Sequence, residues 1–177
     1  MRCKWVNEKN LKYVEYHDKE WGRLNTDEHY LYEMFILECF QAGLSWECIL
    51  NKRESFEKCY DNFDINKVIK YDEAKINELL SNKDIIRNKS KIISSINNSK
   101  IYKDILKEYG SFYNYLCKYS LGKVYNIKTN VTTNELSDSI SKDLYKRGMR
   151  YVGSITIYSY LQAIGIINSH DENCDFK

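Results

Sequence analysis

The chain has 177 residues, and its 27 Lys and Arg against 25 Asp and Glu leave a formal net charge of only +2. This length suits one well-filled domain, or two lobes that share a core, and the charge alone does not indicate a nucleic-acid-binding protein. The chain begins without a long apolar stretch and is polar by its fourth residue. We therefore expect a cytoplasmic protein with no membrane segment, whose six cysteines are thiols or metal ligands rather than disulfides.

Helical signals dominate the first half of the chain. Thr26 is a candidate N-cap for a helix over residues 27–42, and Gly43 is a suitable residue to end it. Three further helices are predicted to begin after capping side chains, at Ser45, Asp64 and Asp72.

The second half continues the helical pattern. A longer helix is predicted from about Asn88 to Tyr109, stopping at Gly110, and Ser111 opens another that ends by Gly122. Residues 123–134 are polar and β-branched, which predicts a loop. Ser137 is a candidate cap for a helix that Gly148 closes, and Gly153 precedes a final apolar helix. Since no linker or repeat divides the chain, the sequence predicts a single all-α domain over residues 1–177.

Glu38 lies on an apolar side of the helix predicted over residues 27–42. At helical spacing it shares a stripe with Leu31, Phe35 and Ala42, and the opposite side of the helix is apolar as well. Burying an unpaired carboxylate costs several kcal/mol. Glu38 therefore either has a polar partner inside the fold or faces a pocket that receives a ligand, and both interpretations are open at this point.

Two cysteines and two histidines lie near the ends of the chain, at Cys3, His17, His170 and Cys174. The last pair has the i, i+4 spacing that allows two side chains of one helical turn to share a metal ion. Two Cys and two His form a closed tetrahedral set that suits structural Zn²⁺, which would hold the two ends together. The alternative is that the histidines cap helices or face water and the thiols are inert.

Aromatic residues are frequent around Glu38, and they include Trp5, Tyr13, Tyr16, Trp21, Tyr30, Tyr32, Phe35, Phe40 and Trp46. Taken singly, most such residues belong to a core. Together they offer flat faces beside a buried acid, a combination that suits a planar, electron-poor heterocycle.

Basic residues surround a glycine turn near the end of the chain. Arg147 and Arg150 flank Gly148, and Gly153 with Ser154 opens the last helix. A helix, a short glycine turn and a second helix with free N–H groups can bind a phosphate, although a run of basic residues is more often a solvated face. A second basic turn over residues 87–91 either reinforces this site or faces water.

Several blocks of the sequence resemble the bacterial DNA-3-methyladenine glycosylase I family. These blocks are RCKWV, YVEYHDKEWG, FILECFQAGLSWECILNKRESF, IIRNKSKI and KDLYKRGMRYVGSITIYSYLQAIGIINSH followed by Cys174. The resemblance runs from Arg2 to about Cys174 and is weakest over residues 100–135. Two positions depart from the family pattern: Asp84 stands where Gly is common before IIRN, and Ser169 replaces the Asp that usually precedes the last histidine.

The resemblance implies a helix-hairpin-helix fold, with the motif at about residues 137–165, and it assigns roles to the residues above. Its structural zinc ligands fall on Cys3, His17, His170 and Cys174. Its base pocket falls on Glu38, which would hold the base, with Tyr13, Tyr16 and Trp46 and, nearer the edge, Trp5 and Trp21. The element that fills the gap left in the duplex corresponds to Gln41, Ala42, Gly43 and Leu44 (the gap-filling turn). The DNA-binding hairpin corresponds to residues 147–153 (the hairpin turn) with Arg147, Gly148 and Gly153, followed by Ser154.

The function implied by the resemblance is base-excision repair. The enzyme would flip 3-methyladenine out of double-stranded alkylated DNA, hydrolyse its N-glycosidic bond, and release the free base to leave an abasic site. We expect a monofunctional enzyme, since no lysine stands out as a nucleophile. We also expect a monomer with one structural Zn²⁺ per chain. One alternative is a non-catalytic, zinc-stabilised DNA-binding module. Another is a metallohydrolase, which a filled Cys₂His₂ shell disfavours because catalytic zinc keeps a position for water.

Overall fold

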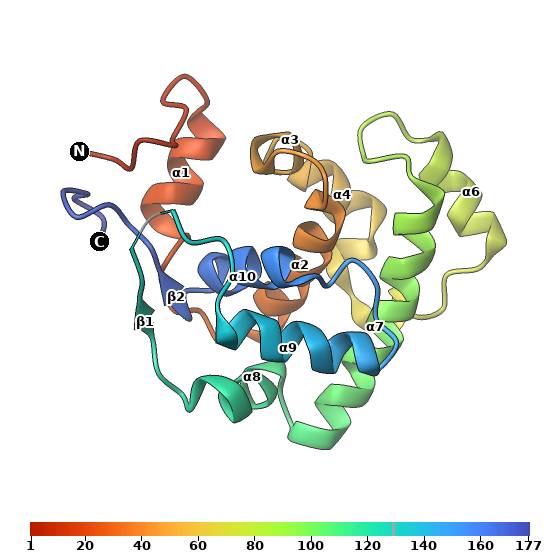
Figure 1. Cartoon of the computed structure of the whole chain (residues 1–177). Coiled ribbons are helices and arrows are strands. Elements are labelled where there is room, and N and C mark those ends of the chain that lie inside the picture. Colours follow the sequence, from red (N-terminus) through yellow and green to blue (C-terminus); the bar gives the residue numbers. More distant parts are fainter. Residues whose placement is uncertain (129) are drawn as a thin grey trace.

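The computed structural model describes residues 1–128 and 130–177, and its regular structure is almost entirely helical (Figure 1). In chain order the elements are α1 (Leu11–Lys19), α2 (Glu28–Gln41), α3 (Trp46–Leu50), α4 (Arg53–Cys59), the 3₁₀ turn η1 (Asp61–Phe63), α5 (Ile65–Val68), α6 (Glu73–Ser81), α7 (Lys89–Tyr109), α8 (Phe112–Ser120), β1 (Tyr125–Asn126), α9 (Glu135–Lys146), α10 (Ser154–Ala163) and β2 (Ile167–Asn168). The prediction of a helical, helix-hairpin-helix architecture is confirmed, and α9 and α10 form the hairpin pair.

The central helix is α2, in which every residue from 31 to 40 is buried. It is surrounded by α10, α7, α8 and α3, so it has no solvent-facing side along this stretch (Figure 1). This explains why its sequence is apolar on nearly all sides. Any polar group on α2 must therefore find a partner within the fold or face an internal space.

Most of the predicted helix starts are confirmed, because the capping side chains form the expected local hydrogen bonds. Ser45, Asp64, Asp72, Asn88 and Ser111 each accept a hydrogen bond from a backbone N–H in the first turn of the helix that follows.

Two predicted caps are wrong. The cap of α2 is Asp27, whose carboxylate accepts from Tyr30 N at 2.9 Å, rather than Thr26. α9 begins at Glu135, and its N-cap is Asn134, three residues before Ser137, in a capping box in which Asn134 accepts from Ser137 N at 2.9 Å. In both cases a second capping residue lies within three positions of the predicted one, and the direction from which the chain enters the helix decides between them.

The loop predicted over residues 123–134 contains a short strand. β1 pairs in parallel with β2, and Tyr125 N donates to Ile166 O at 2.8 Å while Ile127 N donates to Asn168 O at 2.9 Å. The part of this prediction that falls on Thr129 lies outside the described residues. The pairing joins segments about forty residues apart, so it leaves no local sequence signal, and it fixes the segment that leads to the C-terminal histidine.

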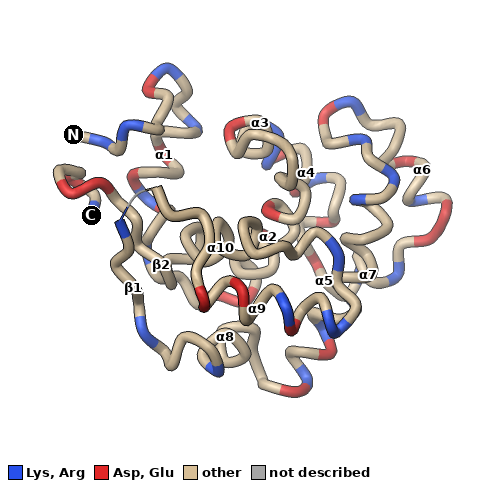
Figure 2. The backbone as a smooth tube through the Cα atoms, in the orientation of Figure 1, with Lys and Arg blue, Asp and Glu red and all other residues tan. Residues whose placement is uncertain are grey.

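The two ends of the chain lie near each other, beside α1 (Figure 1). Charged residues of both signs alternate along the backbone, with several basic residues around the turn between α9 and α10 (Figure 2). Among the described residues, no helix combines the length and the apolar character needed to cross a membrane.

Candidate active site and metal centre

A pocket of about 290 Å³ opens between α1, α2, α3 and α10. Its lining consists of Trp5, Tyr13, Tyr16, Trp21, Glu38, Gln41, Trp46, Asn130, Ser159, Gln162 and Ser169. The six residues predicted to bind the base therefore share one cavity, although they come from the N-terminal segment, α1, α2 and α3. Their role toward a base stays a prediction.

The only titratable carboxylate among the described lining residues is Glu38, which is 3% exposed. Burial raises its pKa to about 8. Its Oε2 has no hydrogen-bond partner among the described residues, and the same is true of the buried Nε1 of Trp46. Of the two interpretations of Glu38, the structure thus favours the one in which it faces a pocket: the cavity presents one unpaired acceptor and one unpaired donor to whatever enters it.

The aromatic side chains form the walls of the pocket. Tyr16 and Trp46 have ring centroids 5.2 Å apart on one side, and Trp5 lies 5.2 Å from Tyr13 and 4.8 Å from Trp21 on the other. Tyr16 is buried, and burial raises the pKa of its hydroxyl, with the neighbouring Tyr30 and Glu38 charges adding to the effect. The ring faces that remain turned to the cavity suit a flat, aromatic ligand.

Sequence reasoning did not find four polar residues of this lining, namely Asn130, Ser159, Gln162 and Ser169. Ser159 and Gln162 lie three positions apart on α10, which is otherwise apolar on that stretch, and this spacing was the available signal. Ser169 is 2% exposed, and its hydroxyl lies 3.5 Å from that of Tyr158. The departure from the family pattern at position 169 therefore falls inside the pocket.

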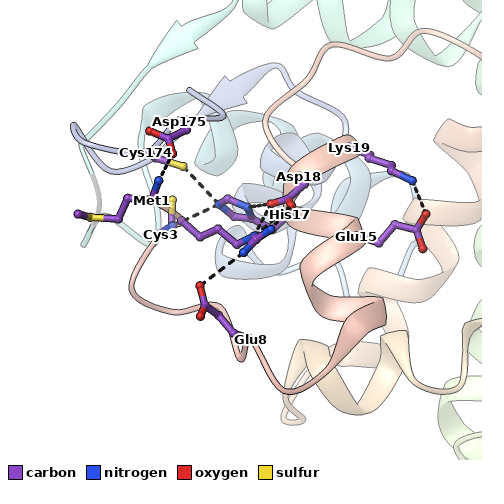
Figure 3. A network of polar contacts seen from close by, with 10 residues as sticks. Met1, Cys3, Glu8, Glu15, His17, Asp18, Lys19, Cys174 and Asp175 are labelled. Carbon is purple, nitrogen blue, oxygen red and sulfur yellow. Dashed lines mark hydrogen bonds and ion pairs between the residues drawn. The ribbon is translucent and has the colours of Figure 1, made fainter.

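The predicted metal ligands Cys3, His17, His170 and Cys174 come together, with their ligand atoms all within 4.8 Å of one another. All four side chains are buried. Figure 3 shows three of them converging, with Nε2 of His17 3.6 Å from Sγ of Cys174. The two ends of the chain meet here, as the sequence predicted.

Each histidine is oriented by a partner on its other ring nitrogen. Nδ1 of His17 lies 2.8 Å from the carboxylate of Asp18 (Figure 3). That carboxylate in turn accepts hydrogen bonds from two N–H groups of Arg2. Nδ1 of His170 lies 2.8 Å from the amide oxygen of Asn168. These contacts leave Nε2 of both rings directed at the cluster, which is the usual arrangement around a metal ion. Sequence reasoning missed Asp18 and Asn168. Asp18 directly follows His17, and Asn168 lies two residues before His170; this proximity in sequence was the available signal.

The chemistry of the cluster fits a metal ion. Nε2 of His170 is buried and has no hydrogen-bond partner among the described residues. Burial, together with the neighbouring His17, lowers the pKa of His170 to about 4, which keeps the ring in the neutral form that binds metals. Burial raises the pKa of Cys3 to about 12, so its thiolate requires a cation beside it.

The Cys₂His₂ cluster lies against the walls of the pocket. The ring of Trp5 is 5.3 Å from that of His17, and the ring of Trp21 is 4.7 Å from that of His170. Gly22 has a φ of +72°, and a Cβ at this position would lie 2.8 Å from the ring of His170. The close approach therefore requires glycine, and it joins the end of α1 to the cluster.

The predicted DNA-binding residues lie in two turns of different character. In the gap-filling turn, Gln41 reaches the pocket, Gly43 has a φ of +79°, and Leu44 is 38% exposed. In the hairpin turn, Gly148 has a φ of +101° and Gly153 is the N-cap of α10 without a side-chain cap.

Two predicted DNA-binding side chains are engaged within the fold. Arg147 donates to Asp143 at 2.8 Å and to Glu108 at 2.7 Å, and Ser154 donates to Asp138. The backbone N–H of Arg147 is engaged as well, since it donates to Asp143 O at 2.9 Å. Of these two residues, Ser154 is therefore the one whose backbone N–H, at the start of α10, suits a phosphate.

Comparison with known proteins places the chain in a family. The family model described as methyladenine glycosylase matches residues 5–177. The DNA-3-methyladenine glycosylase of Haemophilus influenzae is 34% identical over 99% of this chain and 97% of its own length. DNA-3-methyladenine glycosylase 1 of Escherichia coli is 36% identical over 98% of this chain and 95% of its own length. A solved variant of 3-methyladenine DNA glycosylase I in complex with 3-methyladenine superimposes with a TM-score of 0.94, at 29% identity, and covers 99% of this chain and 97% of the other. The chain belongs to the methyladenine glycosylase family.

Proposed function

We propose that this protein hydrolyses the N-glycosidic bond of 3-methyladenine in alkylated double-stranded DNA, releasing the base and leaving an abasic site. The observation that carries this proposal is the pocket itself, in which ring faces surround one buried carboxylate with an unpaired oxygen. Relatives that match nearly the whole chain bear the corresponding name, and one related structure holds the free base.

The proposed recognition step depends on the charge of the damaged base. 3-Methyladenine in DNA is cationic, whereas adenine is neutral. The pocket raises the pKa of Glu38 to about 8 because it deprives the carboxylate of water. A cationic base stacked against the aromatic wall that Tyr16 and Trp46 form offsets this cost and favours the ionised carboxylate, and a neutral base does not.

The proposed chemical step requires little acid catalysis. The bond to a cationic base is already weakened, and the base leaves as a neutral molecule. The roles of the pocket are to receive and stack the flipped base, to accept hydrogen bonds from it at Glu38, and to let water attack C1′ as the bond breaks. No lysine is among the described residues that line the pocket, so we expect no covalent Schiff base and no strand cleavage.

The remaining assignments follow the same proposal. The gap-filling turn would occupy the space vacated by the flipped nucleotide, and the hairpin turn would bind the phosphate backbone through N–H groups at the start of α10. The Cys₂His₂ cluster would hold one Zn²⁺, whose four positions are filled by protein, so the ion would stabilise the fold and take no part in the reaction. We further propose that residues 1–177 act as one domain, as a monomer, in the cytoplasm.

The test incubates methylated duplex DNA with the purified, zinc-loaded protein and identifies released bases by chromatography. We expect release of 3-methyladenine from wild type and its loss in Glu38→Gln, with unchanged zinc content and circular dichroism. Glu54→Gln is the matched control, because Glu54 is exposed and is not among the described residues that line the pocket. Salt-sensitive DNA binding without any release of base would refute the proposal and favour a non-catalytic binding module.

A further inference from the structure

Lys91 is a buried lysine that the proposed reaction does not use. It lies in the first turn of α7, is only 7% exposed, and belongs to the second basic turn (residues 87–91), which the sequence placed either on the DNA face or in water. Its Nζ donates to Phe40 O at 2.7 Å and to Ala42 O at 2.6 Å, and it lies 5.7 Å from the centre of the Tyr151 ring. The ammonium thus contacts two elements outside its own helix, with which it forms charge-assisted hydrogen bonds and a cation–π contact.

The first of these elements is the gap-filling turn. The last carbonyl groups of a helix have no partners within it. Lys91 donates to two carbonyls at the end of α2, where a cation is also favoured by the helix dipole. The turn is tight, since Leu44 N donates to Gln41 O at 2.7 Å and Gly43 has a φ of +79°. Lys91 therefore fixes the point from which this turn leaves the protein core.

The second element is the hairpin turn. Tyr151 has a φ of +58°, and its hydroxyl donates to Ser90 Oγ at 2.9 Å, beside Lys91. Further along α7, the side chain of Asn98 accepts from Arg150 N at 2.9 Å and donates to Arg150 O at 2.8 Å. One face of α7 therefore holds both turns, and Lys91 is the residue that contacts the two together.

We propose that Lys91 is a positioning residue for base excision from DNA, which sets the gap-filling turn against the hairpin turn without touching the base. This inference rests on the proposed function. Lys91 is not among the described residues that line the pocket. Loss of Lys91 therefore affects duplex DNA, which must engage both turns, and spares the free base, which needs only the pocket.

The experiment compares Lys91→Met with Lys100→Met, which removes the same charge from an exposed position on the same helix. Two quantities are measured on zinc-loaded proteins: the single-turnover rate of 3-methyladenine release from methylated duplex DNA, and the affinity for free 3-methyladenine from quenching of tryptophan fluorescence. For Lys91→Met we expect the rate to fall about 10- to 100-fold, the usual effect of a misplacement of about 1 Å, while free-base affinity stays within about twofold. Lys91→Arg, which keeps the charge and the donors, is expected to recover part of the rate.

Two results would overturn the inference: a rate equal to that of Lys100→Met, or a parallel fall in free-base affinity, which would mean that Lys91 merely supports the pocket. If Lys91→Met does not fold, Lys91→Gln retains two N–H donors without the charge and must show the same separation between DNA and free base. A wild-type protein that binds free base but releases none from DNA would instead refute the proposed function, and this inference with it. An active wild type with an equally active Lys91→Met refutes the inference alone.

Discussion

Glu38 should affect the pH dependence of stability in the direction opposite to that of most carboxylates, and replacing it by Gln should remove this effect. Burial raises the pKa of Glu38 to about 8 in the folded protein, against an ordinary value of 4.5. Between these values the folded protein holds a proton that the unfolded chain has released. Stability from this group is therefore greatest at low pH and is lost as the pH rises toward 8.

The size of the effect follows from the same pKa. Gln does not titrate, so the difference in unfolding free energy between Glu38→Gln and wild type should grow by about 2 kcal/mol between pH 6 and pH 8 and level off above it. For a protein of this size, that corresponds to a relative shift in Tm of about 4–8 °C. The stability of Glu38→Gln therefore increases relative to that of wild type as the pH rises.

The assay is thermal unfolding of both proteins, followed by circular dichroism in zinc-containing buffers at pH 6, 7, 8 and 9. Glu54→Gln is the control, because a hydrogen bond from Lys12 lowers the pKa of Glu54 and its ionisation is complete across this range. Its difference from wild type should be flat. A flat difference for Glu38→Gln as well would refute the conclusion that the pocket holds this carboxyl in a desolvated site.

Two further predictions concern the framework of the pocket. Arg53→Met should lower the unfolding free energy by about 2–3 kcal/mol, since it leaves the half-buried carboxylate of Glu20 and the buried carboxylate of Glu33 without their ion-pair partner. In urea titrations, Lys12→Met, which breaks an exposed ion pair, should cost less than about 1 kcal/mol; equal costs would contradict the assignment. Chelation should lower Tm. The unfolding free energy should fall by about 4 kcal/mol relative to protein at a free zinc concentration about 1,000 times the Kd, and Cys174→Ser should abolish this response to chelator. Unfolding of wild type that is insensitive to chelator would exclude a stabilising metal.

The helices could be predicted from the sequence because their signals are local. Capping by Asp72 or Ser111 and termination at Gly110 depend on neighbouring residues only, and all three are confirmed. The family was also predictable, because its blocks are long and lie in order along the chain, and the match over residues 5–177 confirms it.

Features that join distant segments were missed. The pairing of β1 with β2 and the position of the polar side of α10 in the pocket depend on which segments meet in space. Lys91 is the clearest case, since a lysine in a basic turn has the sequence environment of a solvated residue. Its burial is favourable because its ammonium donates hydrogen bonds to carbonyls at the end of α2, about fifty positions earlier in the chain.

Glu38 lies on α2, and the gap-filling turn begins with the last residue of the same helix. This placement has a consequence for how the proposed enzyme would search DNA for damaged bases. Glu38 and Gln41 are three residues apart on α2, a rise of roughly 4.5 Å, and the residues between them are buried. A helix packed on all sides moves as one piece, so a push of the turn into the duplex carries the carboxylate with it. Under the proposed function, entry of the gap-filling turn into the base stack and approach of Glu38 to an extruded base would therefore be one displacement.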